Sequence, residues 1–250
     1  MKKYITQVMI YTKYFYKVTL ENKLVFLYTA LFPVVMIIIQ SKRFFFQKIS
    51  TTTFTRIVLP WIFWLIFTDI LFAVMDIPML REQGYLKQYS SLLSNNSVFI
   101  ISKMIINLFI IFITLLCTSI FCAVLFRMNP FGLIFKLLEV LVLTYIPLVG
   151  ICLPLICIKL KQKSIPVILN LATIALLVIS SLIINTFTVK ITDVLLNTFD
   201  PIYFLNDTFQ FLIGNVPALD FFFTFAIVYI MSMLIGFVSY KKMLILPVEG

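Results

Sequence analysis

The sequence predicts an all-α membrane protein with six transmembrane helices, forming a single transmembrane domain over residues 1–250. Hydrophobic residues make up 62% of the chain and charged residues only 12%, whereas soluble globular domains have roughly 45–50% apolar and 25% charged residues. The chain also contains six apolar stretches close to the ~17–25 residues that a helix needs to cross a hydrocarbon core. They are 24–40, 57–79, 104–126, 137–158, 165–184 and 221–238.

Residues 2–20, ahead of the first apolar stretch, have the pattern of an amphipathic helix. At ~100° per residue, one stripe of the helix is apolar or aromatic and the opposite face is polar. The stripe holds Tyr4, Val8, Tyr11, Phe15 and Val18, and the polar face holds Lys2, Thr6, Lys13 and Lys17. Such a helix lies in a headgroup layer with its lysines toward anionic lipid. We expect an interfacial helix here, and the alternative is a solvated leader.

The distribution of basic residues predicts that both termini face the cytoplasm. Six spans put the two ends on one side, and Lys and Arg in short loops resist translocation. With the N-terminus inside, thirteen of the 20 basic residues are cytoplasmic: Lys2, Lys3, Lys13, Lys17, Lys23, Arg81, Lys87, Lys103, Lys159, Lys161, Lys163, Lys241 and Lys242.

The first outer loop departs from this bias, because it carries Lys42, Arg43, Lys48 and Arg56. Long basic side chains next to a span end reach to lipid headgroups, which is one explanation. A surface that binds an anionic wall polymer or lipid is the other.

Three acidic residues fall within or at the edge of the predicted spans: Asp69, Asp76 and Glu139. A carboxylate at the bilayer centre costs about 2.5–3.5 kcal/mol on insertion scales. Asp69 and Asp76 are seven residues apart, share a helix face and are candidates for lining a substrate path. Alternatively, Asp76 and Glu139 form ion pairs at the membrane interfaces, near Arg81 and Lys136 respectively.

Several kinds of chemistry are excluded by inspection. The chain has no His, which removes imidazole bases and His-based zinc sites. Its six Gly are too scattered for a phosphate-binding loop. The four Cys, at positions 117, 122, 152 and 157, lie inside spans at a spacing that fits neither metal binding nor a loop disulfide. We interpret them as packing residues and expect no cofactor in this chain.

Two loops carry recognisable motifs. The loop 81–97 between the second and third spans begins with Arg81-Glu82-Gln83-Gly84-Tyr85-Leu86-Lys87-Gln88, and a polar stretch then leads through Ser102-Lys103 into the third span. The outer loop 185–220 contains Asp200-Pro201-Ile202-Tyr203-Phe204-Leu205. There Asp is placed as an N-cap and Pro as the first helical residue, which predicts an apolar helix that runs toward Gly214 and either dips into the outer leaflet or packs on the spans.

Taken together and in order, these motifs resemble the type-2 ATP-binding-cassette (ABC) exporter permeases. The run from Arg81 to Lys87 is similar to that family's coupling helix, and the Asp200–Leu205 run is similar to its N-P-x-x-Y-L segment before the last span. The resemblance covers the whole chain. Gln210 departs from the family near a position that often holds Arg, which leaves a charge role there in doubt.

The resemblance implies a permease that works as two copies with two separate ATPase subunits. Residues 82–88 would sit in a groove on the ATPase, which would hold the ATP and Mg, and the permease itself would not be an enzyme. The cargo path would lie at the permease dimer interface.

The few charges of the predicted path favour a lipid-like or amphipathic cargo. In size and composition the chain is similar to the permeases that export peptide toxins and bacteriocins from Gram-positive bacteria, including those that export phenol-soluble modulins. This places it in a bacterial plasma membrane, with no nucleic-acid partner. The competing interpretations are an ion- or proton-coupled transporter that uses Asp69, an intramembrane enzyme, and a non-transporting immunity or sensor protein.

Overall fold

The computed structural model describes residues 2–21, 23–92, 95, 97–159, 164–186 and 192–247, and helices account for most of them. The elements, in chain order, are α1 Lys2–Glu21, α2 Lys23–Ser41, η1 Lys42–Phe44, α3 Thr51–Ile57, α4 Leu59–Glu82, α5 Tyr85–Leu92, α6 Ser97–Leu125, α7 Pro130–Cys152, η2 Leu153–Cys157, α8 Ile165–Thr186, α9 Val194–Phe199, α10 Pro201–Leu212 and α11 Ala218–Lys241.

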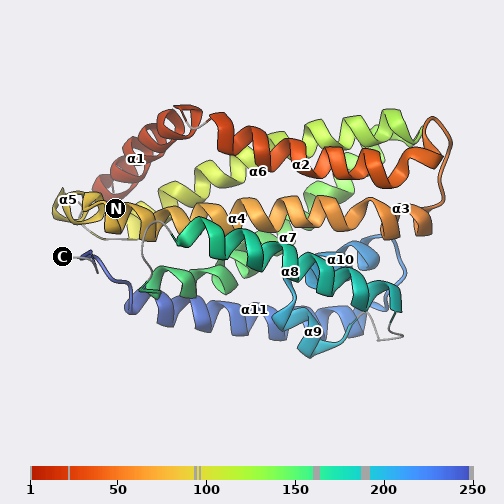
Figure 1. The fold of residues 1–250 in the computed structure, drawn as a ribbon. Coiled ribbons are helices and arrows are strands. Elements are labelled where there is room, and N and C mark those ends of the chain that lie inside the picture. Colours follow the sequence, from red (N-terminus) through yellow and green to blue (C-terminus); the bar gives the residue numbers. More distant parts are fainter. Residues whose placement is uncertain are drawn as a thin grey trace.

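The long helices run lengthwise through the molecule, side by side (Figure 1). The ends of the chain and α5 lie at one extreme, which we call the termini end, and α3 lies at the opposite one, which we call the far end. The helices α4, α6 and α11 run most of the way between the two ends, whereas α2 and α8 begin farther from the termini end. A polypeptide in lipid must satisfy its backbone hydrogen bonds internally, and a helix does so within one segment.

Four helices in the described part are long and apolar enough to cross a membrane: α4, α6, the continuous stretch Pro130–Cys157 formed by α7 and η2, and α11. The protein is therefore an all-α, membrane-embedded protein. In α8 the described apolar part, Val167–Ile183, is shorter. Four of the six spans predicted from sequence thus have a matching helix of sufficient length among the described residues.

The helix α4 forms the centre of the bundle. In the most apolar stretch of α4, 83% of the residues are buried, whereas in that of α11 only 28% are buried. The helix α4 packs against α2, α6, α7, α8 and α10. The outer faces of α6, α7 and α11 instead expose large apolar side chains such as Phe109, Val142 and Phe223. Such surfaces suit a hydrocarbon solvent.

The third long helix extends beyond the predicted span at its N-terminal end. α6 begins at Ser97, seven residues before the predicted stretch 104–126, because Val98, Phe99 and Ile100 are buried against the rest of the protein. The loop that follows α5 is correspondingly short.

The N-terminal helix forms over the predicted residues, but its apolar stripe faces protein. Phe15 is 1% exposed and its ring lies 5.0 Å from that of Phe99 in α6. The hydroxyl of Ser102 in α6 donates to the carbonyl of Val8 at 3.0 Å. The extra two turns of α6 provide the surface for this packing, whereas Lys13 and Lys17 on the other face are exposed.

The backbones of α7 and α11 touch at a seam of small residues. A Cβ atom added to Gly150 would lie 2.5 Å from the carbonyl oxygen of Ser232, and one added to Gly236 would lie 3.2 Å from Cα of Gly150. Small residues let membrane helices approach closely, so that packing and weak polar contacts hold them together.

This seam gives a stability prediction with an internal control. Gly150→Ala must push backbone of α11 away, and overpacking of this kind costs about 1–3 kcal/mol. Gly132→Ala in the same helix meets nothing nearer than 3.8 Å, so it gains the ~0.5–1 kcal/mol of helix preference of Ala over Gly. We expect thermal unfolding in detergent to show a lower midpoint for Gly150→Ala and an equal or higher one for Gly132→Ala. Equal midpoints for both variants would contradict the seam.

Candidate functional site

The helix α5 presents a short row of exposed side chains at the termini end. It begins after Gly84, whose φ of +78° reverses the chain in a conformation that favours glycine. The exposed residues around this turn are Gln83, Tyr85, Lys87 and Gln88, while Leu86 is 3% exposed and anchors the helix. Tyr85 is a large aromatic side chain at 47% exposure. We call the four exposed residues the α5 surface.

A tyrosine cluster fixes α5 to its neighbours. The hydroxyls of Tyr14 in α1 and Tyr89 in α5 lie 2.7 Å apart. The Tyr89 ring lies 5.8 Å from that of Tyr11 and 5.9 Å from that of Phe99. Burial, together with the hydrogen bond to Tyr14, raises the pKa of Tyr89, so the cluster stays uncharged. Aromatic pairs of this geometry contribute about 0.5–1.5 kcal/mol each beyond area burial.

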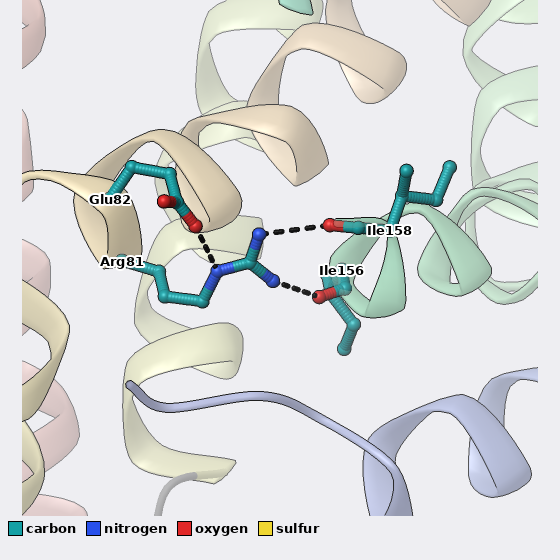
Figure 2. Close-up of polar contacts among 4 residues, drawn as sticks. All are labelled: Arg81, Glu82, Ile156 and Ile158. Atoms are coloured by element: carbon teal, nitrogen blue, oxygen red, sulfur yellow. Dashed lines mark hydrogen bonds and ion pairs between the residues drawn. The ribbon is translucent and has the colours of Figure 1, made fainter. Parts of the chain in front are cut away.

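Arg81 anchors the other side of α5, at the end of α4 (Figure 2). Its Nε donates to Glu82 Oε1 at 2.7 Å, and its two terminal nitrogens donate to the carbonyls of Ile156 at 3.1 Å and Ile158 at 2.8 Å. Those carbonyls lie at the end of η2, where a helix leaves acceptors without intrahelical partners. A cation is also favoured at a helix C-terminus. The guanidinium thus links the start of the α5 segment to the end of the α7–η2 span.

The predicted ATPase-coupling residues, Arg81 to Gln88, therefore fall into a buried group and an exposed group. Arg81 is 0% exposed and the Glu82 side chain is 3% exposed, so neither presents its side chain to a partner. Sequence reasoning placed both on the surface, because a charged residue in a loop is usually solvated and no local pattern pointed to the carbonyls near residue 157. The exposed members of the set are those of the α5 surface.

Asp76 pairs with Lys103, which corrects the expected pairing with Arg81. Lys103 Nζ lies 2.5 Å from Asp76 Oδ2 and 5.3 Å from the centre of the Phe15 ring. This ion pair links α4, α6 and α1 at the termini end. On α7, Glu139 is exposed and forms no ion pair with Lys136 in the described part of the chain.

Asp69 is buried near the middle of α4, at 6% exposure. Its backbone carbonyl accepts from Asn107 Nδ2 at 2.9 Å, and Asn107 Oδ1 accepts from the Tyr145 hydroxyl at 3.1 Å. These bonds join α4, α6 and α7 in the bundle interior. Asp76, by contrast, has a side chain that is 45% exposed, so the two carboxylates do not share one environment.

The outer segment forms the predicted helix, α10. Asp200 Oδ1 accepts from the backbone N–H groups of Ile202 at 3.0 Å and Tyr203 at 3.1 Å, and Pro201 is the first helical residue. The hydroxyl of Ser180 in α8 donates to the same oxygen at 2.8 Å. Every residue from Pro201 to Gln210 is buried, because α10 lies among α4, α7, α8 and α11. The segment is thus packed on the long helices.

This packing buries two carboxyl groups. Asp200 is 5% exposed and Asp207 is 1% exposed, and Asp200 Oδ2 and Asp207 Oδ1 have no hydrogen-bond partner among the described residues. Burial raises the pKa of Asp200 against the opposing effect of its hydrogen bonds. It raises the pKa of Asp207 to about 7, because a carboxylate away from water is disfavoured.

Among the described residues, no three His, Cys, Asp or Glu side chains come together in a way that could hold a metal ion. The four cysteines are free thiols. Comparisons with known protein families, curated proteins and solved structures give no match.

Loss of the Arg81 contacts should strongly destabilise the termini end. Arg81→Gln leaves the Glu82 carboxylate buried without its cation, and breaking one side of a buried pair costs about 3–5 kcal/mol. Lys87→Gln, at an exposed position of the same segment, should change stability by less than about 0.5 kcal/mol. Thermal unfolding of the two variants in detergent measures the difference, and a wild-type midpoint for Arg81→Gln would refute the role given to this residue.

Asp207 should make stability depend on pH near neutrality. Its pKa is higher in the folded protein than the ordinary value of 3.8, so the folded state binds the proton more tightly and stability falls as pH rises from about 4 to about 7. Asp207→Asn should remove this slope and unfold at a higher temperature than wild type at pH 8. One kcal/mol of stability corresponds to about 2–4 °C in Tm for a chain of this size. We expect the Tm of Asp207→Asn at pH 8 to exceed that of wild type by at least this much.

The matched control for this experiment is Asp220→Asn, because Asp220 is an exposed carboxylate at the start of α11. That variant should keep the wild-type pH dependence of Tm. If Asp207→Asn and wild type lose stability in parallel between pH 5 and pH 8, Asp207 is not the titrating group.

Proposed function

We propose that this protein is the membrane-spanning permease subunit of an ATP-driven ABC exporter, and that the α5 surface docks onto a separate ATPase subunit. The observation that carries this proposal is a short helix, exposed on one face and packed on the other against α1 and α6, at the termini end of the bundle. The run that resembles the coupling helix of type-2 exporters, Arg81–Lys87, leads into that helix and includes its first residues.

The contacts of α5 give a route by which a movement of the ATPase would reach the membrane. Tyr89 connects α5 to α1 and α6, and Arg81 connects it to the end of α7 and η2. Coupling between two sites is a difference of interaction free energy between two states. A docking helix that moved independently of the spans would transmit none of it.

We place the protein in a bacterial plasma membrane, with α2, α4, α6, α7–η2, α8 and α11 as six spans. The termini end would face the cytoplasm, in agreement with the distribution of Lys and Arg. ATP and Mg would be held by the partner, which agrees with the lack of a phosphate-binding loop in this sequence. Two copies of the permease would form the transport path with two ATPase subunits.

The proposed cargo is a hydrophobic or amphipathic substrate, with a peptide toxin or bacteriocin as the favoured class. The long helices carry few charges, and their buried polar side chains such as Thr114, Thr118 and Thr144 donate to carbonyls within their own helices. Few polar groups would therefore remain to bind a sugar polymer or an ion.

A secondary transporter driven by ions or protons is the main competing class, and it would use Asp69. It predicts full activity of the isolated chain and loss of activity in Asp69→Asn. A non-transporting immunity or sensor protein predicts no substrate movement at all.

The test is co-purification of the tagged permease with its ATPase from the native host, comparing Tyr85→Ala with Tyr16→Ala. Tyr85 and Tyr16 are exposed to a similar degree, 47% and 44%, but only Tyr85 belongs to the α5 surface. An aromatic residue at the centre of an interface typically contributes 2 kcal/mol or more, so Tyr85→Ala should lower ATPase recovery by about 10-fold or more. Tyr16→Ala should leave it unchanged.

ATP turnover of the purified complex should also respond to an amphipathic peptide. Recovery of the permease alone, fully active in reconstituted vesicles, would overturn the proposal. Equal ATPase recovery with Tyr85→Ala and Tyr16→Ala would remove the α5 surface as the docking site.

A further inference from the structure

A lateral groove of about 400 Å³ opens on the outside of the bundle near the termini end. Its walls come from α6, α7 and α11, including Ile101, Met104, Ile146, Val149, Met233 and Phe237. Gly150, Ser232 and Gly236 also line it, so its floor is the seam where α7 and α11 touch. It contains neither the α5 surface nor Asp69.

The groove is apolar because its polar groups are already bonded. The Tyr145 hydroxyl donates to the Met104 carbonyl at 2.6 Å, and the Ser232 hydroxyl donates to the Tyr229 carbonyl at 2.8 Å. Around it, the side chains of Ile105 and Leu234 are 45% and 57% exposed. The opening thus lies within a surface that hydrocarbon would cover.

The end of the groove nearest the termini is polar and basic. The Tyr240 hydroxyl donates to Asn95 Oδ1 at 2.6 Å, and tyrosine is enriched at the level of lipid headgroups. Lys241 Nζ lies 4.4 Å from the centre of the Phe237 ring, which places an ammonium group beside a groove-lining residue. Lys242 follows, and both lysines are exposed.

We propose that the lateral groove is a binding site for an anionic phospholipid, with an acyl chain in the groove and the headgroup next to Lys241 and Lys242. The length agrees: from Ser232 to Tyr240 a helix rises about 12 Å, and one leaflet contributes about half of the ~30 Å hydrocarbon core. Each basic residue near the surface contributes about 1 kcal/mol toward anionic lipid.

The groove fits an anionic lipid because its long sides are apolar and its termini end is basic, as are the two parts that such a lipid would place there. The Gly150–Ser232 contact prevents the floor from deepening without separation of α7 and α11. This proposal needs the membrane location but not the ATPase, so it stands or falls separately from the exporter proposal.

The experiment uses the full chain reconstituted in vesicles that contain phosphatidylglycerol with a photoreactive diazirine on its acyl chain. After irradiation, peptide mapping should find label on Ile101, Met104, Met233 or Phe237. Ile101→Trp and Met233→Trp, which fill the groove, should each reduce this label at least 5-fold. The control Val142→Trp lies on α7 at 72% exposure, outside the groove, and should leave the label unchanged.

The headgroup is tested with the double variant Lys241→Gln and Lys242→Gln. Phosphatidylglycerol should label the wild-type groove several-fold more than a phosphatidylcholine analogue, and the double variant should label equally with both. Melting curves identify any variant that is misfolded. If the double variant is misfolded, the comparison of phosphatidylglycerol with phosphatidylcholine labelling in the wild-type protein tests the headgroup preference. Equal labelling of all variants and lipids would overturn the proposal.

Discussion

Arg81 is a buried positive charge at the end of α4, and the arrangement of helices at the termini end depends on the groups that bind its guanidinium. A buried ion is stable only if its partner and hydrogen bonds offset the lost hydration. Here the offset comes from one carboxylate and two carbonyls. Because the carbonyls belong to Ile156 and Ile158, the same contact fixes where the α7–η2 span ends relative to α4. The position of α5, which follows within a few residues, is fixed with it.

The termini end therefore behaves as a connected block. Asp76 and Lys103 join α4 to α6, the tyrosine cluster joins α5 to α1, and Arg81 joins α4 to η2. The far end is built differently. There Pro201–Gln210 of α10 are buried among the long helices, and the capping oxygen of Asp200 is shared with Ser180 of α8. In the proposed exporter, the force from the ATPase would enter at the connected block.

The parts of this structure that sequence could predict are those governed by local rules. Asp200 and Pro201 form an N-terminus because the Asx oxygen and the fixed proline φ satisfy that role in any helix. The stripe through Tyr11 and Phe15 predicted the first helix because the helical repeat of apolar residues is also a local rule. Sequence could not identify what those elements touch: Phe15 meets Phe99, which precedes the predicted span 104–126, so the stripe packs on protein. Arg81 was placed on the surface because its acceptors are about 75 residues away and are backbone atoms, which leave no pattern in a sequence.

In the proposed exporter, α5 lies on the cytoplasmic side, within reach of an ATPase. The most direct measurement is labelling of Tyr85→Cys with a membrane-impermeant maleimide, in a chain whose four natural cysteines are changed to alanine. Gln47→Cys, exposed in the loop at the far end, serves as the reference. We expect Gln47→Cys to be labelled in intact cells and Tyr85→Cys only after the membrane is opened. Labelling of Tyr85→Cys in intact cells would place α5 outside, where no ATPase could reach it, and would contradict the account.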